Sequence, residues 1–288
     1  MDDTSYLTAA AIGHVAHETL QTETGANICG NTSKGFFAVT DNKRVLFVSH
    51  QTFKGPLTIN INGKLPSRQS LSHETHLLLS PDRIRFIQST LEIRINPQTL
   101  VWTPMVLNTL DFNLEAFITR SDLIEREMTS QLSNQDQVQE NLTYLENSLR
   151  SALSSRNKLA VYESLFNLLG YGVGLTPSGD DFICGFLLAA HAWKEFLFPT
   201  FALQKTIRKI VEVARKKTTT LSANLIACAA SGSADERIIS CVKWLNSGGH
   251  SAAFIMEELL SYGSSSGCDT LAGMLAFIQS SPIFYQKP

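Results

Sequence analysis

Two parts of the chain differ in the spacing of their apolar residues. From about residue 25 to 105, short β-prone runs alternate with turn residues, and the runs fall at 35–40, 44–49, 55–62, 83–89 and 91–95. Leu57, Ile59 and Ile61 occupy every second position, which is typical of a half-buried strand. This part is predicted to form an antiparallel sheet or a small barrel. Ahead of it, residues 6–20 have apolar positions near helical spacing and are predicted to form a helix that includes Gly13.

After about residue 110 the apolar positions follow the helical period. Val138, Leu142, Leu145, Leu149 and Leu153 lie on one face of a predicted amphipathic helix. Further helices are predicted at 158–169, 179–196, 203–215, 221–230, 235–246, 251–262 and 267–279. The predicted fold class is therefore α+β, with an antiparallel β-rich N-terminal domain at 1–115 and an α-helical domain at 116–288. The boundary is expected within 108–122, where no period is clear.

The composition excludes several classes of function. Among 288 residues, 24 Lys and Arg stand against 26 Asp and Glu, and the densest basic stretch, at 215–217, is three residues long. This balance argues against binding to nucleic acid or to an anionic membrane. The longest apolar stretch, 182–193, is shorter than the roughly 20 residues that cross a bilayer. The first residues lack a signal-peptide pattern, and the five cysteines form no C-x-x-C pair, so we expect a cytoplasmic protein with reduced, mostly buried thiols.

The stretch from Gly170 to Phe182 joins two predicted helices and is rich in glycine. Its alternating glycines, including Gly172 and Gly174, allow sharp turns and a close approach of the backbone to a ligand. Ser178, followed three residues later by Asp181, is similar to a capping box and predicts a helix start. The N–H groups at such a helix end suit a carboxylate or a phosphate. The stretch is neither a Walker A loop nor a G-x-G-x-x-G fingerprint, so a nucleotide-binding fold is disfavoured.

The same pattern returns 88 residues further along the chain. Without a gap, Ser178, Gly179, Asp181 and Gly185 match Ser266, Gly267, Asp269 and Gly273. Each copy is predicted to place its serine at a helix N-cap, its aspartate at N3 and its second glycine one turn further in, where another helix or a ligand can come close. We expect the two helix starts to face each other across one polar pocket. The alternative is that both are ordinary N-caps with glycines at helix crossings.

Hydroxyl residues gather at another predicted helix start. Thr219, Thr220 and Ser222 follow the basic residues at 215–217, and Thr176 lies in the glycine-rich stretch. Together they offer many hydrogen-bond donors for an anionic ligand. The alternative for the threonines is a solvated loop with an ordinary helix cap.

Three aspartates are the candidates for acid–base chemistry. Asp180, Asp181 and Asp269 follow the two helix starts, and their oxygens could instead bind Mg²⁺ or Mn²⁺, which would indicate a metal-dependent hydrolase. Cys184 and Cys268 lie close by in the sequence, but without a neighbouring histidine their expected role is packing or capping rather than nucleophilic catalysis.

These motifs resemble those of a known bacterial family. The resemblance rests on the stretch from Gly172 to Phe182, on Thr219-Thr-x-Ser222, on the stretch from Ser265 to Gly273 and on the strand-like run from Gly55 to Asn60. The family is the AllH-like family, which is linked to a subunit of oxamate carbamoyltransferase. It implies transfer of a carbamoyl group between phosphate and oxamate, which interconverts oxalurate and carbamoyl phosphate in allantoin breakdown, within a multi-subunit assembly. The family pattern implies a histidine where this chain has Ser264.

Three hypotheses follow. The chain is a carbamoyltransferase subunit, a non-catalytic binding or scaffold subunit, or a metal-dependent hydrolase of a small acid. We expect a small anionic substrate (carbamoyl phosphate, oxamate or oxalurate), other transferase subunits as partners and no cofactor, with a divalent metal as the alternative. The expected catalytic residues are Asp180, Asp181 and Asp269, and the expected ligand-binding residues are Gly172, Gly174, Thr176, Ser178, Gly179, Thr219, Thr220, Ser222, Ser265, Ser266 and Gly267.

Overall fold

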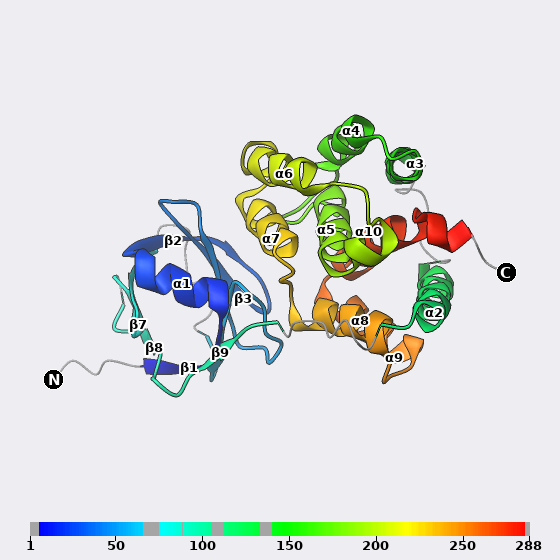
Figure 1. Ribbon diagram of the computed structural model, residues 1–288. Helices are drawn as coiled ribbons and strands as arrows, with labels where there is room; N and C mark the ends of the chain where they lie inside the picture. Colours follow the sequence, from blue (N-terminus) through cyan, green and yellow to red (C-terminus); the bar gives the residue numbers. More distant parts are fainter. Residues whose placement is uncertain (1–5, 66–74, 88, 105–111, 133–139, 286–288) are drawn as a thin grey trace. The chain divides into compact units, whose positions relative to one another are not determined.

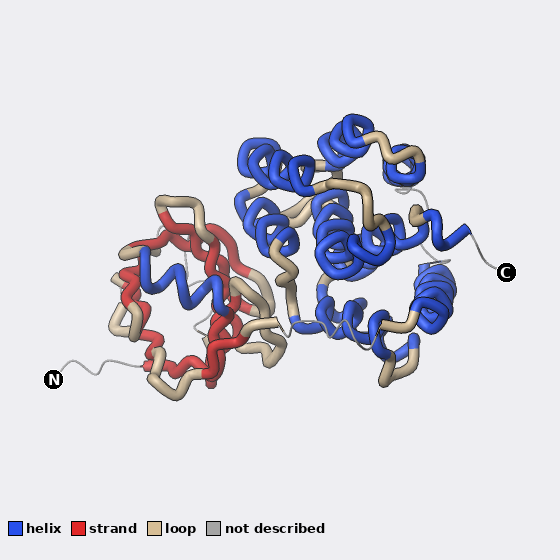
Figure 2. The backbone as a smooth tube through the Cα atoms, viewed as in Figure 1, coloured by secondary structure: helices blue, strands red, loops and turns tan. Residues whose placement is uncertain are grey.

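The chain consists of a β-rich unit and a helical unit. The computed structural model describes residues 6–65, 75–87, 89–104, 112–132 and 140–285. Contacts between Cα atoms divide the chain into Met1–Pro104 and Met105–Pro288. The division expected between residues 115 and 116 falls inside the first turn of the first helix of the second unit, and part of the expected boundary zone lies outside the described residues. Figure 2 shows strands together with helix α1 (His14–Thr22) in the first unit and helices in the second.

Eight described strands close into a ring, and a ninth pairs on its outside. The strands are β1 (Tyr6–Gly13), β2 (Gly25–Asn31), β3 (Gly35–Thr40), β4 (Val45–Ser49), β5 (Thr58–Asn62), β6 (His76–Ser80), β7 (Arg83–Phe86), β8 (Glu92–Arg94) and β9 (Leu100–Trp102). Their order is β5-β4-β3-β2-β6-β7-β8-β1-β9, and pairing of β1 with β5 closes the ring (Figure 1). The prediction of a β-rich small barrel is confirmed. Among the described pairs most are antiparallel, whereas β1–β8, β1–β9 and β4–β5 are parallel.

The predicted helix at 6–20 is wrong in its first half. Tyr6–Gly13 is a strand, and only His14–Thr22 forms a helix, α1. Strand β1 pairs with three other strands, and this pairing outweighs the helix propensity of its run of alanines. The chain turns at Gly13, where a Cβ atom would lie 2.0 Å from the carbonyl oxygen of Gly55. Helix α1 then contributes Ala16 and Leu20 to the core of the barrel.

Helices form the second unit, and all of the described ones except α2 lie at predicted places; α2 begins in the zone where the sequence has no clear period. The helices are α2 (Leu114–Leu132), α3 (Glu140–Ser154), α4 (Lys158–Leu168), α5 (Ser178–Leu197), α6 (Gln204–Lys217), α7 (Thr220–Ala230), α8 (Glu236–Ser247), α9 (Ala252–Tyr262) and α10 (Ser266–Gln279), followed by a 3₁₀ turn at Pro282–Tyr285. The α+β fold class is thereby confirmed. Of the predicted amphipathic face in α3, Val138 lies outside the described residues, whereas Leu149 and Leu153 are fully buried. None of the described helices has the length and apolar character that a membrane span needs.

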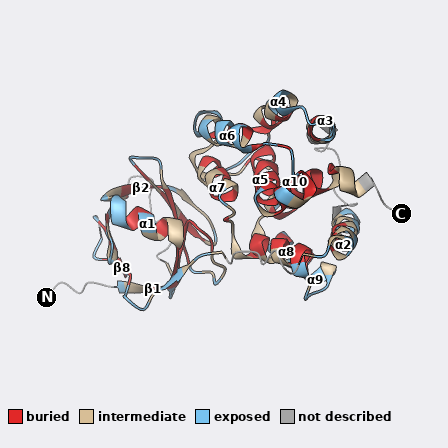
Figure 3. Cartoon of the chain, viewed as in Figure 1, coloured by how far each residue is buried: buried red, intermediate tan, exposed pale blue. Residues whose placement is uncertain are grey.

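Helices α5 and α10 form the centre of the helical unit (Figures 1 and 3). Their backbones touch at two glycines: a Cβ atom at Gly185 would lie 1.8 Å from the carbonyl oxygen of Thr270, and one at Gly273 would lie 1.9 Å from that of Phe182. Phe182 and Thr270 are themselves matched positions of the repeat. Each glycine therefore meets the equivalent carbonyl of the other copy, and the two copies are related by an approximate two-fold rotation.

The first glycine of each copy also has the same role. A Cβ atom at Gly179 would lie 2.1 Å from the carbonyl oxygen of Leu168, in the last turn of α4. In the second copy, a Cβ atom at Gly267 would lie 2.0 Å from the carbonyl oxygen of Leu259, near the end of α9. Both glycines thus pack the start of one helix against the end of the preceding helix, so the repeated unit is a helix–loop–helix hairpin.

Candidate functional site

Helices α5 and α10 begin one residue earlier than their serines predict. The N-cap residues are Pro177 and Ser265, and neither side chain accepts a capping hydrogen bond. The prediction that Ser178 and Ser266 are N-caps is wrong, because the loop takes over the capping of α5: the Gly179 N–H donates to the Tyr171 carbonyl at 2.9 Å. Ser178 and Ser266 are instead the first residues of their helices, and their hydroxyls bond to the other helix.

The two helix starts exchange hydrogen bonds between serine and aspartate. Ser266 of α10 donates to the Asp181 carboxylate of α5, and Ser178 of α5 donates to the Asp269 carboxylate of α10. Thr176 also bonds to Asp181, its hydroxyl lies 3.2 Å from that of Ser266, and Ser265 bonds to Asp269. We call these residues the Ser-Asp cluster: Thr176, Ser178, Asp181, Ser265, Ser266 and Asp269. It contains all four hydroxyl residues predicted at the two helix starts.

The carboxyls of the Ser-Asp cluster hold protons more tightly than carboxyls in water. Asp181 is only 2% exposed, and burial raises its pKa to about 8, with smaller contributions from the charges of Asp269 and Asp180. Hydrogen bonds from Ser266 and Thr176 offset part of this rise. Burial also raises the pKa of Asp269, against hydrogen bonds from Ser178 and Ser265. At neutral pH, Asp181 is therefore a neutral carboxylic acid that can donate a proton.

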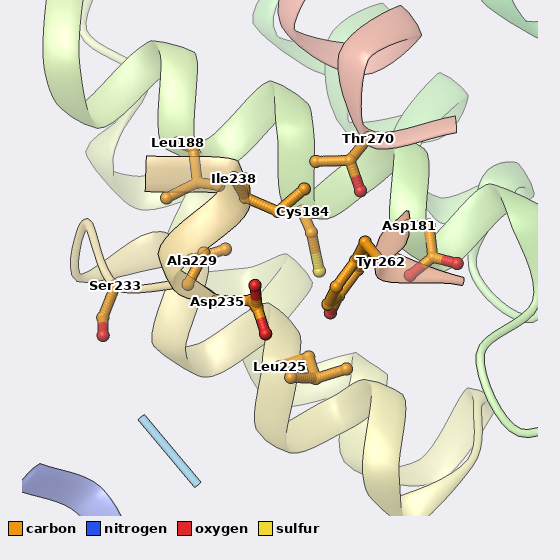
Figure 4. A pocket seen from close by; sticks show the side chains of 11 residues that line it. Asp181, Cys184, Leu188, Leu225, Ala229, Ser233, Asp235, Ile238, Tyr262 and Thr270 are labelled. Carbon is orange, nitrogen blue, oxygen red and sulfur yellow. The ribbon is translucent and has the colours of Figure 1, made fainter. Parts of the chain in front are cut away.

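A small cavity lies beside Asp181 (Figure 4). Its volume of about 20 Å³ suits about one water molecule. Its lining includes the polar or titratable residues Asp181, Cys184, Tyr262, Thr270 and Asp235. The remaining lining residues are Leu188, Leu225, Ala229, Ser233, Ala234 and Ile238. In Figure 4 the Tyr262 ring lies between Asp181 and Asp235, and the Cys184 sulfur points into the same space.

Burial keeps the Cys184 thiol and the Tyr262 phenol of this wall in their neutral forms. It raises the pKa of Cys184 and of Tyr262 well above their ordinary values, and it raises the pKa of Cys268 to about 11. Neither thiol is therefore an activated nucleophile, because the thiolate is the reactive form.

A buried ion pair supports the far side of the cavity. Arg237, 5% exposed, forms two hydrogen bonds to Asp235, from Nε at 2.8 Å and from Nη2 at 2.9 Å. The guanidinium also donates to the Ser261 carbonyl at 2.8 Å and lies 5.1 Å from the centre of the Tyr262 ring. Sequence reasoning missed these residues. The only available signal was the Asp-Glu-Arg start of a predicted helix, which does not reveal what that start packs against.

The glycine-rich loop has the backbone that its glycines predict. Gly170, Gly172 and Gly174 have φ angles of +73°, +112° and +95°, a region that residues with a Cβ rarely adopt. The loop is exposed at its tip, where Val173 is 91% accessible to solvent. Near the end of the loop, the Leu175 carbonyl accepts hydrogen bonds from the hydroxyls of Thr219 and Ser222.

The threonine-rich helix start holds this loop. The Thr219 hydroxyl donates to the Leu175 carbonyl at 2.7 Å and caps α7 by accepting from the Ser222 N–H at 3.0 Å. Ser222 also donates to the Leu175 carbonyl, at 3.4 Å. Thr220 is the first residue of α7, and its carbonyl accepts from the Asn224 amide at 2.8 Å. These hydroxyls are therefore close to the loop, and their predicted role in binding a ligand stays a prediction.

Asp180 is separate from the other two aspartates. Its carboxylate accepts from the Gly170 N–H at 2.8 Å and from the Thr218 hydroxyl, so it fastens the start of the loop to the end of α6. The three predicted catalytic aspartates thus divide into a pair, Asp181 and Asp269, and one residue with bonds elsewhere. In the described part of the chain no group of three or more His, Cys, Asp or Glu residues is arranged to hold a metal ion.

One segment of the chain, which contains the predicted site residues, matches the model of a known protein family. Residues 168–278 match the model of the family described as oxamate carbamoyltransferase subunit AllH. The segment is AllH-like. It begins at the end of α4, ends within α10 and contains every predicted site residue, so the resemblance seen in the sequence is confirmed there. No curated protein and no solved structure matches the chain. Ser264, which stands where the family pattern implies a histidine, is exposed between α9 and α10 of the AllH-like segment.

Proposed function

We propose that this chain is a subunit of an oxamate carbamoyltransferase-type enzyme and that the Ser-Asp cluster binds its small anionic substrate. The main support is that residues from two helix starts meet in the Ser-Asp cluster, which lies within the AllH-like segment. The family name implies the transferase subunit. The substrates that fit its chemistry are carbamoyl phosphate, oxamate and oxalurate.

The cluster has the electrostatics that a small anion needs. Each helix N-terminus carries roughly half a positive charge, and two of them contribute here. Protonation of Asp181 removes a negative charge that would otherwise repel the ligand. Ser265 is exposed, so an anion reaches the hydroxyls from the solvent side, whereas the cavity on the other side has room for about one water molecule.

The chemistry of carbamoyl transfer requires two further things from the protein. Negative charge develops on the carbamoyl oxygen as a nucleophile attacks the carbon, and hydrogen-bond donors at a helix N-terminus can stabilise it. When oxamate leaves, its amide nitrogen must receive a proton, because an amide anion is a very poor leaving group. Asp181 carries a proton at neutral pH and is the group we assign to this step.

Thermal unfolding in the presence of ligands tests this assignment. Carbamoyl phosphate, phosphate, oxamate and oxalurate are added singly to the purified chain, and Mg²⁺ or Mn²⁺ is added in parallel. A ligand at 100 times its dissociation constant adds about 2.7 kcal/mol of apparent stability, which is about 5–10 °C in the midpoint for a unit of this size. The Ser178→Ala, Ser266→Ala double variant should lose the shift. Ser247→Ala, an exposed serine at the end of α8, is the matched control and should keep it.

Each outcome points to one hypothesis. A shift with carbamoyl phosphate or oxalurate that is lost only in the double variant supports the transferase site. A shift with metal alone favours the metal-dependent hydrolase. If no ligand shifts the midpoint of any folded variant, the chain has no autonomous anion site. A scaffold subunit that works through partner chains is then the better explanation.

A further inference from the structure

Asp181 and Asp269 share an arrangement that no other carboxyl in the described part of the chain has. Each receives a hydroxyl hydrogen bond from the opposite repeat, and each keeps one oxygen, Oδ2, buried without a hydrogen-bond partner. Only 2% of the surface of Asp181 is exposed to solvent. A buried carboxylate oxygen without a partner is costly, whereas a protonated carboxyl places an O–H there.

In the part of the chain that the structure describes, no positive charge contributes to the pKa of Asp181 or Asp269. The titratable groups that interact with Asp181 are Asp180 from its own helix, Cys184 one turn further, Tyr262 of α9 and Asp269 of α10. Cys268 lies beside Asp269. Two ionised carboxylates in this setting would repel each other, as in other sites where two carboxyls are held close together.

We propose that Asp181 and Asp269 work as one carboxyl pair that shares a single proton, with Asp181 as its donor and Asp269 as its acceptor. The crossing glycines fix the spacing of the two helices, and Ser178 and Ser266 orient the two carboxyls from opposite sides. These serines are positioning residues for the pair. Burial raises the pKa of both carboxyls, that of Asp181 to about 8.

The pair gives the proposed transferase a route for its proton, and this second step rests on the proposed function. In phosphorolysis of oxalurate, an oxygen of hydrogen phosphate forms a bond to the carbamoyl carbon while the bond from that carbon to the oxamate nitrogen breaks. The bonding electrons move to the nitrogen, which takes the proton of Asp181, and Asp269 takes the proton of the phosphate. Transfer of that proton from Asp269 to Asp181 restores the pair, so the products are oxamate and carbamoyl phosphate with no net change of protons.

Infrared difference spectroscopy of the isolated full-length chain tests the shared proton without any substrate. The signal is the carbonyl stretch of a protonated carboxyl, followed between pH 5 and pH 9. The wild-type chain should lose one such band with a midpoint near pH 8, and Asp181→Asn should lack that transition. In Asp269→Asn the midpoint should move to lower pH, because the neighbouring negative charge is gone. Asp41→Asn, in an exposed turn of the barrel, is the matched control and should behave as wild type.

A serine variant should move the midpoint of the same titration in the opposite direction. Ser266→Ala removes a hydrogen bond that favours the ionised form of Asp181, so the midpoint should move to higher pH. The transition persisting in Asp181→Asn would overturn the proposal, and so would an unchanged midpoint in Asp269→Asn, because the carboxyls would then titrate independently. Failure of the ligand-induced shifts would refute the substrate assignment and leave these titrations untouched. The two failures are therefore distinguishable.

Discussion

Replacement of Asp181 by asparagine should stabilise the helical unit, and the gain should increase with pH. A carboxyl whose pKa rises on folding binds its proton more tightly in the native state than in the unfolded state. Its favourable contribution is complete below the unfolded pKa of about 3.8 and is lost as the pH rises toward the folded pKa of about 8. Asparagine matches the shape of the protonated acid and cannot ionise in the unfolded chain.

The magnitude follows from the two pKa values. Each pH unit between them costs about 1.4 kcal/mol, because the unfolded state ionises and the native state does not. At pH 5 the wild-type chain has lost about 2 kcal/mol relative to the variant, and at pH 7 it has lost about 4 kcal/mol. This difference is a large part of the 5–15 kcal/mol that stabilises an ordinary domain.

Urea unfolding at pH 5, 6, 7 and 8 measures this difference. Trp193 and Trp244 are buried in the helical unit, and a Trp102→Phe background removes the tryptophan of β9, so fluorescence then reports on the helical unit. The free energy of unfolding should fall with pH in the wild-type background and change much less with pH in Asp181→Asn. The same slope in both proteins would refute the assignment of the buried proton to Asp181.

Three other predictions concern the elements around the site. Gly273→Ala should destabilise the chain by about 3 kcal/mol or more in urea unfolding, since its Cβ would overlap a backbone carbonyl of α5. Gly30→Ala should cost about 1 kcal/mol or less, because its Cβ would make only an ordinary contact with the Phe37 ring at 3.9 Å. Thr219→Ala should lower stability by about 1–2 kcal/mol in the same assay and speed proteolysis of the glycine-rich loop, because it removes both the α7 cap and the bond to Leu175. Brief alkylation of the native protein should modify Cys29 before the four buried cysteines, as mass spectrometry of the intact chain can show. Modification of several thiols at equal rates would mean that the helical core opens easily.

Local patterns in the sequence were sufficient for most of the secondary structure. The strand at 35–40 and the helix from 158 to about 168 were predicted almost to the residue, because turn residues and a change of period mark their ends. The stretch at 6–13 was predicted wrongly, since alanines have no strong strand preference. Its pairing with β5 and β8 depends on residues 47 to 86 positions away.

The candidate site was accessible from the sequence only where its residues repeat. Ser178 and Asp181 were found through their match with Ser266 and Asp269, although their roles differ from simple capping. Tyr262 and Arg237 carry no such signal. Tyr262 lines the cavity and Arg237 bonds to Asp235 in its wall because α8 and α9 pack beside α5 and α10, and this packing depends on the whole core rather than on any local pattern.

The exchange of hydrogen bonds between the two hairpins has a consequence for the evolution of this segment. Each serine has its aspartate partner in the other copy, so a change in one copy cannot be compensated by a change within the same copy. Among homologous sequences, substitutions at Ser178 should therefore accompany substitutions at Asp269, and those at Ser266 should accompany those at Asp181. Ser178 and Asp181 in one copy should vary independently of each other, and so should Ser266 and Asp269 in the other copy. The two halves of the duplication must then diverge together, as two partners in a symmetric dimer do.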